Sequence, residues 1–180
     1  MSDNSISIIP KKSVYQGNEK KAQEILEWLI SLDIVKPLPS DCVLGAPLGY
    51  PISNGAIHAT NHPNDLPFSL ITNGLEIVTS RQIFDNGGNG VESIICPTCS
   101  GNLADEDWAF FEEWQNQTED TITCTLCQSK SSIHSFHFTP TWGFSNLGFT
   151  FWNWSDLTNE FIESFKDKLN SDVDIVYRHL

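Results

Sequence analysis

The hydrophobic pattern of the N-terminal part of the chain predicts a strand followed by a helix. Residues 5–10 read Ser-Ile-Ser-Ile-Ile-Pro, a β-rich run that a proline ends. Gly17 and Asn18 can then cap a helix. Behind them, apolar residues recur at the i, i+3, i+4 and i+7 spacing of one helix face: Ala22, Ile25, Leu26 and Leu29. Lys and Glu side chains fall on the other face, so we expect this helix to cover a sheet.

Similar patterns return further along the chain. β-Branched and aromatic residues predict strands at residues 75–84, 132–139, 148–154 and 173–178. Between the last two strands, Ser155 or Asp156 can cap a helix that runs to about Leu169. Its apolar residues lie four apart: Leu157, Phe161, Phe165 and Leu169.

The order of these elements predicts the fold class. The larger units come in the order strand, helix, strand, metal insertion, strand, helix and strand. Without the insertion, this is the β-α-β-β-α-β order of an α+β, ferredoxin-like split βαβ sandwich. We therefore expect residues 1–180 to form a single α+β domain. An inserted subdomain at residues 91–130 would sit on the hairpin between the second and third core strands.

The segment from residue 36 to residue 73 has a different character. Its many prolines and glycines exclude a long regular element, while its apolar residues favour a loop that packs onto the domain. His58 and His62 are four apart and Asp65 follows, a spacing that holds a metal on a helix. Pro63 argues against that helix, so we do not expect a second metal site there.

The strongest chemical signal is a pair of Cys-x-x-Cys motifs, Cys96-Pro-Thr-Cys99 and Cys124-Thr-Leu-Cys127. Two such knuckles supply the four thiolates of the tetrahedral shell that Zn²⁺ favours. We predict one structural Zn²⁺ per chain, bound by these four cysteines.

The sequence around the knuckles suggests how the metal is surrounded. A short helix is expected over residues 104–114, with Trp108, Phe111 and Trp114 shielding the sulfurs. His134 and His137 are candidate outer or replacement ligands, although ordinary strand histidines are the commoner explanation.

The two motifs resemble the knuckles of zinc ribbons and also those of rubredoxins, over about 35 of the 180 residues. The helical spacer between the knuckles departs from a minimal ribbon. As a whole, the chain looks like small acidic bacterial proteins of uncharacterised function. The resemblance implies a metal, zinc or iron, and assigns no activity.

Charge limits the class of partner. The chain has 10 Lys and Arg against 23 Asp and Glu, for a net charge of −13. From Gln82 to Ser129 it has nine acidic residues and no Lys or Arg. This composition disfavours nucleic acid and anionic membranes and favours a basic protein partner.

The cysteines and the N-terminal residues indicate the cellular compartment of the protein. Neither a signal peptide nor an apolar run of membrane-spanning length is visible, so we expect a cytoplasmic protein with reduced thiols. Cys42 is then a spare thiol, expected in the core or a loop.

Three functions are compatible with these features. A non-enzymatic zinc protein that binds a basic protein through an acidic surface, of inhibitor or immunity type, agrees best with the charge. A hydrolase or transferase would use the 37–73 loop region, with His58, His62, Asp65 or Cys42 as its chemistry. An iron-loaded, rubredoxin-like redox protein would use the same four cysteines.

Overall fold

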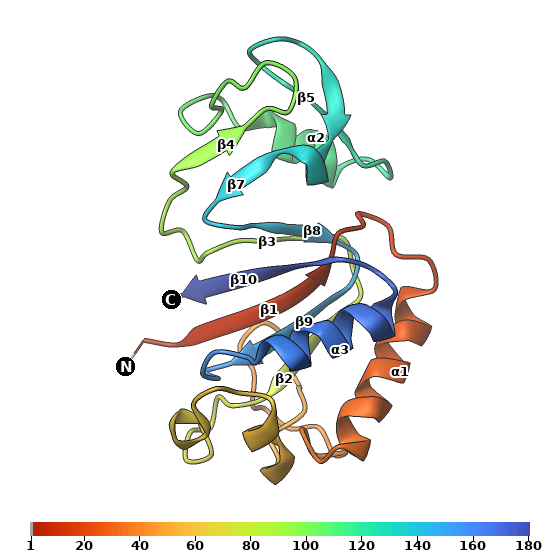
Figure 1. Ribbon diagram of the computed structural model, residues 1–180, viewed down its shortest axis with the longest axis vertical. Helices are drawn as coiled ribbons and strands as arrows, with labels where there is room; N and C mark the ends of the chain where they lie inside the picture. The colour runs from red at the N-terminus through yellow and green to blue at the C-terminus, as the bar shows by residue number, and fades with distance from the viewer. Residues whose placement is uncertain (1) are drawn as a thin grey trace.

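A four-stranded antiparallel sheet organises the fold, which the computed structural model describes for residues 2–180 (Figure 1). Its strands, in the order β10-β1-β9-β2, are β1 (Asn4–Pro10), β2 (Leu75–Val78), β9 (Gly148–Trp152) and β10 (Val173–His179). Because side chains alternate along a strand, Ile6 and Ile8 of β1 face one side and Ser5 and Ser7 the other. All four are buried, so both faces of this sheet are covered.

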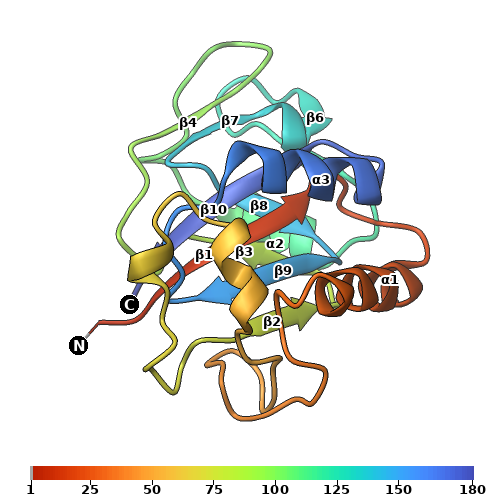
Figure 2. The same cartoon turned by 60° about the horizontal axis from the view of Figure 1, so that its bottom comes forward.

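Two helices cover the face that carries Ile6 and Ile8. They are α1 (Asn18–Ser31) and α3 (Asn159–Leu169), and Figure 2 shows them on the same side of the sheet. The predicted apolar stripes of both helices pack into the largest hydrophobic cluster of the protein. The predicted cap of α3 was wrong, because the hydroxyl of Thr158 accepts the N–H of Phe161 and Ser155 instead binds Thr60.

The loop from residue 36 to residue 73 packs against the same core, as predicted. It contains two short 3₁₀ helices, Asn54–His58 and Pro63–Asp65, and buries Ile52, Ala56, Ala59 and Leu66 in the main cluster. Backbone pairing ties it to the sheet where Tyr50 meets Leu75. This loop is therefore long because it forms a packed cover over the core of the main sheet.

A second layer lies on the opposite face of the sheet and carries the four cysteines (Figure 1). It consists of three two-stranded ribbons and one short helix, α2 (Ala109–Gln115). The ribbons pair β3 (Gln82–Phe84) with β8 (Gly143–Ser145), β4 (Ser93–Ile95) with β7 (His137–Thr139), and β5 (Thr121–Thr123) with β6 (Lys130–Ser132). This layer has a hydrophobic cluster of its own, from Ile94 to Phe144.

The two layers approach closely where glycines replace side chains. A Cβ on Gly143 would lie 2.7 Å from the Cδ1 atom of Ile9, and one on Gly148 would lie 2.3 Å from the ring of Phe84. Real Cβ contacts are not that short, so a side chain at either position would force Ile9 or the ring of Phe84 to shift.

Three element predictions were wrong in detail. Residues 75–84 form two strands, because β2 pairs with β9 in the main sheet and β3 pairs with β8 in the second layer. Residues 132–139 contain a 3₁₀ turn, Ile133–Ser135, before β7, so they do not form the one continuous strand that was predicted. The helix expected at residues 104–114 begins only at Ala109.

The sheet and its three α-helices confirm a mixed α+β fold. The ferredoxin-like assignment and the boundaries of a subdomain at residues 91–130 stay predictions. Within residues 2–180, none of the helices has the length and hydrophobicity that a membrane span needs.

Candidate metal centre

The two Cys-x-x-Cys motifs adopt the same local structure. Cys96 follows β4 and Cys124 follows β5, and each motif then turns back on itself. The N–H of Ser100 donates to the carbonyl of Cys96 at 3.0 Å, and the N–H of Gln128 donates to that of Cys124 at 2.9 Å. Ser100 and Gln128 both have positive φ, 59° and 62°, which closes each turn. Two equivalent knuckles thus face each other.

Further hydrogen bonds hold each knuckle and reach its sulfurs. The N–H of Cys96 donates to the carbonyl of Gly101, and the N–H of Cys124 donates to that of Ser129, at 3.0 and 2.9 Å. The N–H groups of Thr98 and Gly101 lie 3.4 Å from the Sγ atoms of Cys96 and Cys99. Donors aimed at sulfur favour the thiolate, which is the form that binds metal.

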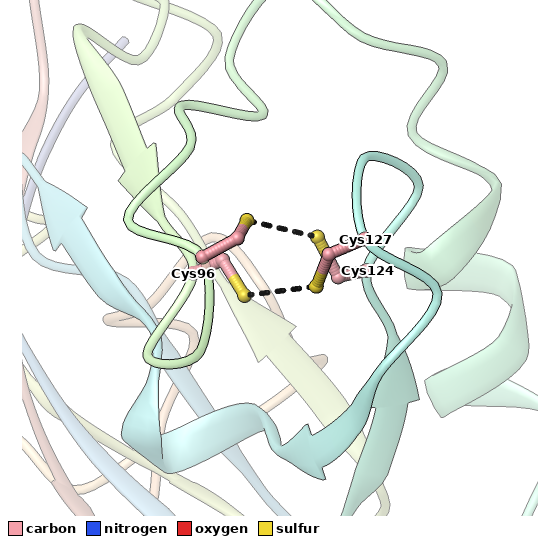
Figure 3. A group of neighbouring side chains, drawn as sticks. Cys96, Cys124 and Cys127 are labelled. Atoms are coloured by element: carbon pink, nitrogen blue, oxygen red, sulfur yellow. Dashed lines mark hydrogen bonds between the residues drawn. The ribbon is translucent and has the colours of Figure 1, made fainter.

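The four sulfurs converge on one point (Figure 3). The Sγ atoms of Cys96 and Cys127 are 4.0 Å apart, those of Cys99 and Cys124 are 3.9 Å apart, and all four lie within 4.8 Å of one another. A tetrahedron of sulfurs at the usual Zn–S distance of about 2.3 Å has edges of about 3.8 Å. The cluster therefore fits a four-coordinate metal ion, and iron suits a four-thiolate shell as well as zinc.

The electrostatics of the cluster also suit a cation. Burial is the largest influence on Cys96 and opposes ionisation, yet the N–H groups of Cys99 and Thr98, together with hydrogen bonds from the thiols of Cys124 and Cys99, lower the pKa of this thiol to about 6. At Cys99 the N–H of Gly101 acts to lower the pKa, but desolvation and the other three thiols raise it to about 11. Neighbouring thiolates repel one another, and a bound cation would remove that repulsion.

Burial places the centre at the edge of the second layer. Cys96 and Cys124 are 1% and 0% exposed and belong to the same cluster as Phe110, Phe111 and Trp114, whereas Cys99 and Cys127 are exposed. Phe111 and Trp114 therefore share one hydrophobic cluster with the two inner cysteines, and their shielding of the sulfurs stays a prediction. Trp108 is partly exposed and instead contacts Phe111 and Trp142.

Trp114 also joins the second layer to the rest of the protein, which the sequence did not indicate. Its indole N–H donates to the hydroxyl of Ser13 at 2.8 Å, and Ser13 lies in the connection between β1 and α1. The guanidinium of Arg81 lies 3.9 Å from the centre of the Trp114 ring and donates to the carbonyls of Trp114 and Glu119. No periodicity marks these contacts, because they join residues far apart in the sequence.

His134 belongs, with Ser13, Arg81 and Trp114, to this contact between the two layers, here called the joint, rather than to the metal cluster. Its Nε2 atom lies 3.1 Å from the hydroxyl of Ser13 and 3.4 Å from the Oδ1 atom of Asp120. A Ser-His-Asp triad needs the serine and the carboxylate on opposite ring nitrogens, whereas here both approach the same one. Ser13 is also buried and already bonded to Trp114. The arrangement therefore holds the layers together and does not activate a nucleophile.

The remaining candidate residues do not form a site. His58, His62 and Asp65 are exposed, and among residues 2–180 the four cysteines are the one group of His, Cys, Asp and Glu arranged to hold a metal. Cys42 is buried beside Val43 and Trp152, as expected for a core thiol.

Comparisons of the chain with protein-family models, with curated proteins and with solved structures found no match.

Proposed function

We propose that this chain is a non-enzymatic, cytoplasmic metal protein that binds a basic protein partner, as an inhibitor or immunity-type protein does. The metal is one Zn²⁺ held by Cys96, Cys99, Cys124 and Cys127. Four protein thiolates leave no open coordination position for substrate, which is the arrangement of structural zinc sites. The metal therefore has a structural role, and the surface around it recognises the basic protein partner.

The observation that carries this proposal is the exposure of the acidic residues in the segment 82–129, here called the acidic segment. Three of its nine acids pair with another side chain: Asp85 with Arg178, Glu113 with Thr123, and Asp120 with Ser132 and His134. The other six are exposed: Glu92, Asp105, Glu106, Asp107, Glu112 and Glu119. A Zn²⁺ with four thiolates adds a net charge of −2 to this field.

Such a field suits a cationic protein and opposes a phosphate backbone. Charges of one sign steer an oppositely charged partner and raise its association rate, an effect that salt screens. The six exposed acids have no Lys or Arg between them in the sequence of the acidic segment to neutralise them. This supports recognition of a basic protein.

The test is a charge reversal with a matched control. Asp105, Glu106 and Glu112 are exposed, and no side-chain hydrogen bond or ion pair within residues 2–180 involves them. Replacing all three with Lys raises the net charge from −13 to −7, because each reversal adds two units. The control reverses Asp156, Asp167 and Asp172, which are equally exposed and lie outside the acidic segment, and reaches the same net charge.

The wild-type protein and both variants are used to recover partners from cell extract, and association rates are measured for each protein recovered. We expect slower association for the first variant, little change for the control, and slower association of the wild type at high salt. Equal effects of the two variants would show that only net charge matters. The proposal would be contradicted by a partner whose association rate changes neither with salt nor with either variant.

An iron-loaded, rubredoxin-like redox protein is the second candidate, because the sulfur geometry that suits zinc also suits iron. Elemental analysis distinguishes the two, and a red iron chromophore would favour the redox function.

We also infer that the main sheet is a ferredoxin-like split βαβ sandwich. Support comes from the strand order, in which β9 lies between β1 and β2, the strands that α1 connects, and β1 lies between β9 and β10, the strands that α3 connects. This assignment concerns the fold and carries no activity.

A further inference from the structure

The face of the main sheet opposite α1 and α3 carries buried polar residues. Ser7 of β1 pairs with Thr150 of β9, which in turn pairs with Glu76 of β2, so three polar side chains stand side by side across three strands. All three are at most 7% exposed. In the sequence this alternation of polar and apolar residues looks like a solvent-facing side of a sheet, so it gives no sign of a buried site.

A cavity of about 210 Å³ opens over this face. Besides Ser7, Thr150 and Glu76, the residues that line it include Gly45 of the 36–73 loop, Asp85, which follows β3, and Arg178 of β10. One water occupies about 30 Å³, so this volume admits a small organic group rather than a single solvent molecule. The cavity does not include the four cysteines.

Glu76 is the buried charge of this cavity. Its Oε2 atom accepts the indole N–H of Trp152 at 2.8 Å and the backbone N–H of Gly45 at 3.0 Å. Both donors are neutral and both bind the same oxygen. Within residues 2–180, no hydrogen bond reaches Oε1 and no Lys, Arg or His side chain forms an ion pair with Glu76.

Arg178, the one cationic side chain among the residues that line the cavity, already forms an ion pair. The Nε atom of Arg178 lies 3.8 Å from the Oδ1 atom of Asp85, and both side chains are more than a third exposed, at the rim. A carboxylate buried without a counter-charge is costly, and a cation that enters the cavity removes that cost.

We infer that this cavity binds a primary ammonium group, with Glu76 as its counter-ion. An ammonium has three N–H donors, and the cavity offers three acceptor groups side by side, namely the carboxylate of Glu76 and the hydroxyls of Thr150 and Ser7. The hydroxyls of Ser7 and Thr150 bond each other at 2.8 Å, which leaves lone pairs to accept from a ligand. The ammonium can belong to a free aliphatic amine or to a lysine side chain of another protein.

The test follows the indole N–H signal of Trp152 in the full-length protein by NMR, with the signal assigned from a Trp152→Phe variant. The probes are n-butylammonium, its neutral counterpart 1-butanol, and the capped tripeptide Gly-Lys-Gly. The test variant is Glu76→Gln, which keeps an acceptor for Gly45 and Trp152 but removes the charge. The matched control is Glu113→Gln, because Glu113 is a partly buried carboxylate outside the cavity that accepts from Thr123.

We expect the ammonium probes to shift the Trp152 signal of the wild type and of the Glu113→Gln variant, and 1-butanol to leave it unchanged. Glu76→Gln should weaken ammonium binding roughly tenfold or more, because hydrogen bonds to a charged group are about twice as strong as neutral ones. Tighter binding of the tripeptide than of n-butylammonium identifies a lysine side chain as the source, and the reverse identifies a free amine.

Three results would overturn the inference: no shift with either ammonium probe, an equal shift with 1-butanol, or equal affinity in Glu76→Gln. The inference does not depend on the exposed acids Asp105, Glu106 and Glu112, since reversing them should leave ammonium binding almost unchanged at physiological salt.

Discussion

Replacing Trp114 with Phe tests whether the two layers of the protein fold as one unit. Trp114 is fully buried in the cluster of the second layer, and its indole N–H bonds Ser13 of the first. The cation of Arg81 lies against its ring. Phe keeps an aromatic ring at this place but removes the N–H donor and part of the ring surface.

The magnitude can be worked from these contacts. Losing the hydrogen bond to Ser13 costs about 1 kcal/mol. Removing two buried ring carbons costs about 0.8 kcal/mol for each. A weaker interaction with Arg81 adds about 0.5 kcal/mol. We therefore expect Trp114→Phe to lower the free energy of unfolding by about 3 kcal/mol.

The assay is equilibrium denaturation in urea, together with hydrogen exchange of both layers. The matched control is Trp28→Phe in α1, because Trp28 is only partly buried and has no indole hydrogen bond within residues 2–180. Its ring stacks on Phe161 and meets Phe165 edge to face. We expect a smaller loss in the control. A loss in Trp114→Phe no larger than in the control would refute the view that this joint couples the layers.

Three further predictions concern the metal and pH. Elemental analysis should find one zinc ion per chain, and a metal-free protein with four free thiols would contradict the assignment. Cys124→Ser should increase hydrogen exchange in residues 91–130 more than in the main sheet, whereas simultaneous exchange of the whole chain would exclude a separable subdomain. Burial lowers the pKa of His134, although Asp120 acts in the opposite direction. The unfolded chain therefore binds a proton first as the pH falls below about 6.5, so acidification should reduce stability, by at most about 1.4 kcal/mol per pH unit. His134→Gln should remove that dependence, and the same change at the exposed His137 should not.

The sequence was most informative where structure depends on near neighbours. The Cys-x-x-Cys spacing brings two thiols together within one turn, and the structure brings the two pairs within 4.8 Å. The stripes of α1 and α3 were likewise readable, because a 3.6-residue repeat of apolar side chains is itself the face that packs. The pairing of thiols within each knuckle and the stripes of the helices needed only local geometry.

The sequence was least informative where distant segments meet. Residues 75–84 form one unbroken run of strand-forming residues, yet Arg81 turns toward Trp114 and the chain changes sheet. The hydrogen bonds of Ser13 with Trp114 and with His134 join residues that are 101 and 121 positions apart in the sequence. Local propensity cannot encode such contacts, because tertiary packing decides them.

The burial of the polar face of the main sheet also could not be predicted from the sequence. Ser7, Glu76 and Thr150 occupy alternate positions that would face water in a two-layer sandwich. The second layer and the 36–73 loop cover that face, so these side chains become the floor of a cavity.

The metal centre and the cavity therefore depend on the same joint between layers. Cys96 and Cys124 pack in one cluster with Trp114, and Trp114 is bonded to Ser13 in the connection that follows β1. β1 also supplies Ser7 to the cavity. A metal that orders the second layer would, through Trp114, also hold the cover over Glu76 in place. Loss of the metal should accordingly weaken ammonium binding even though no cysteine lines the cavity.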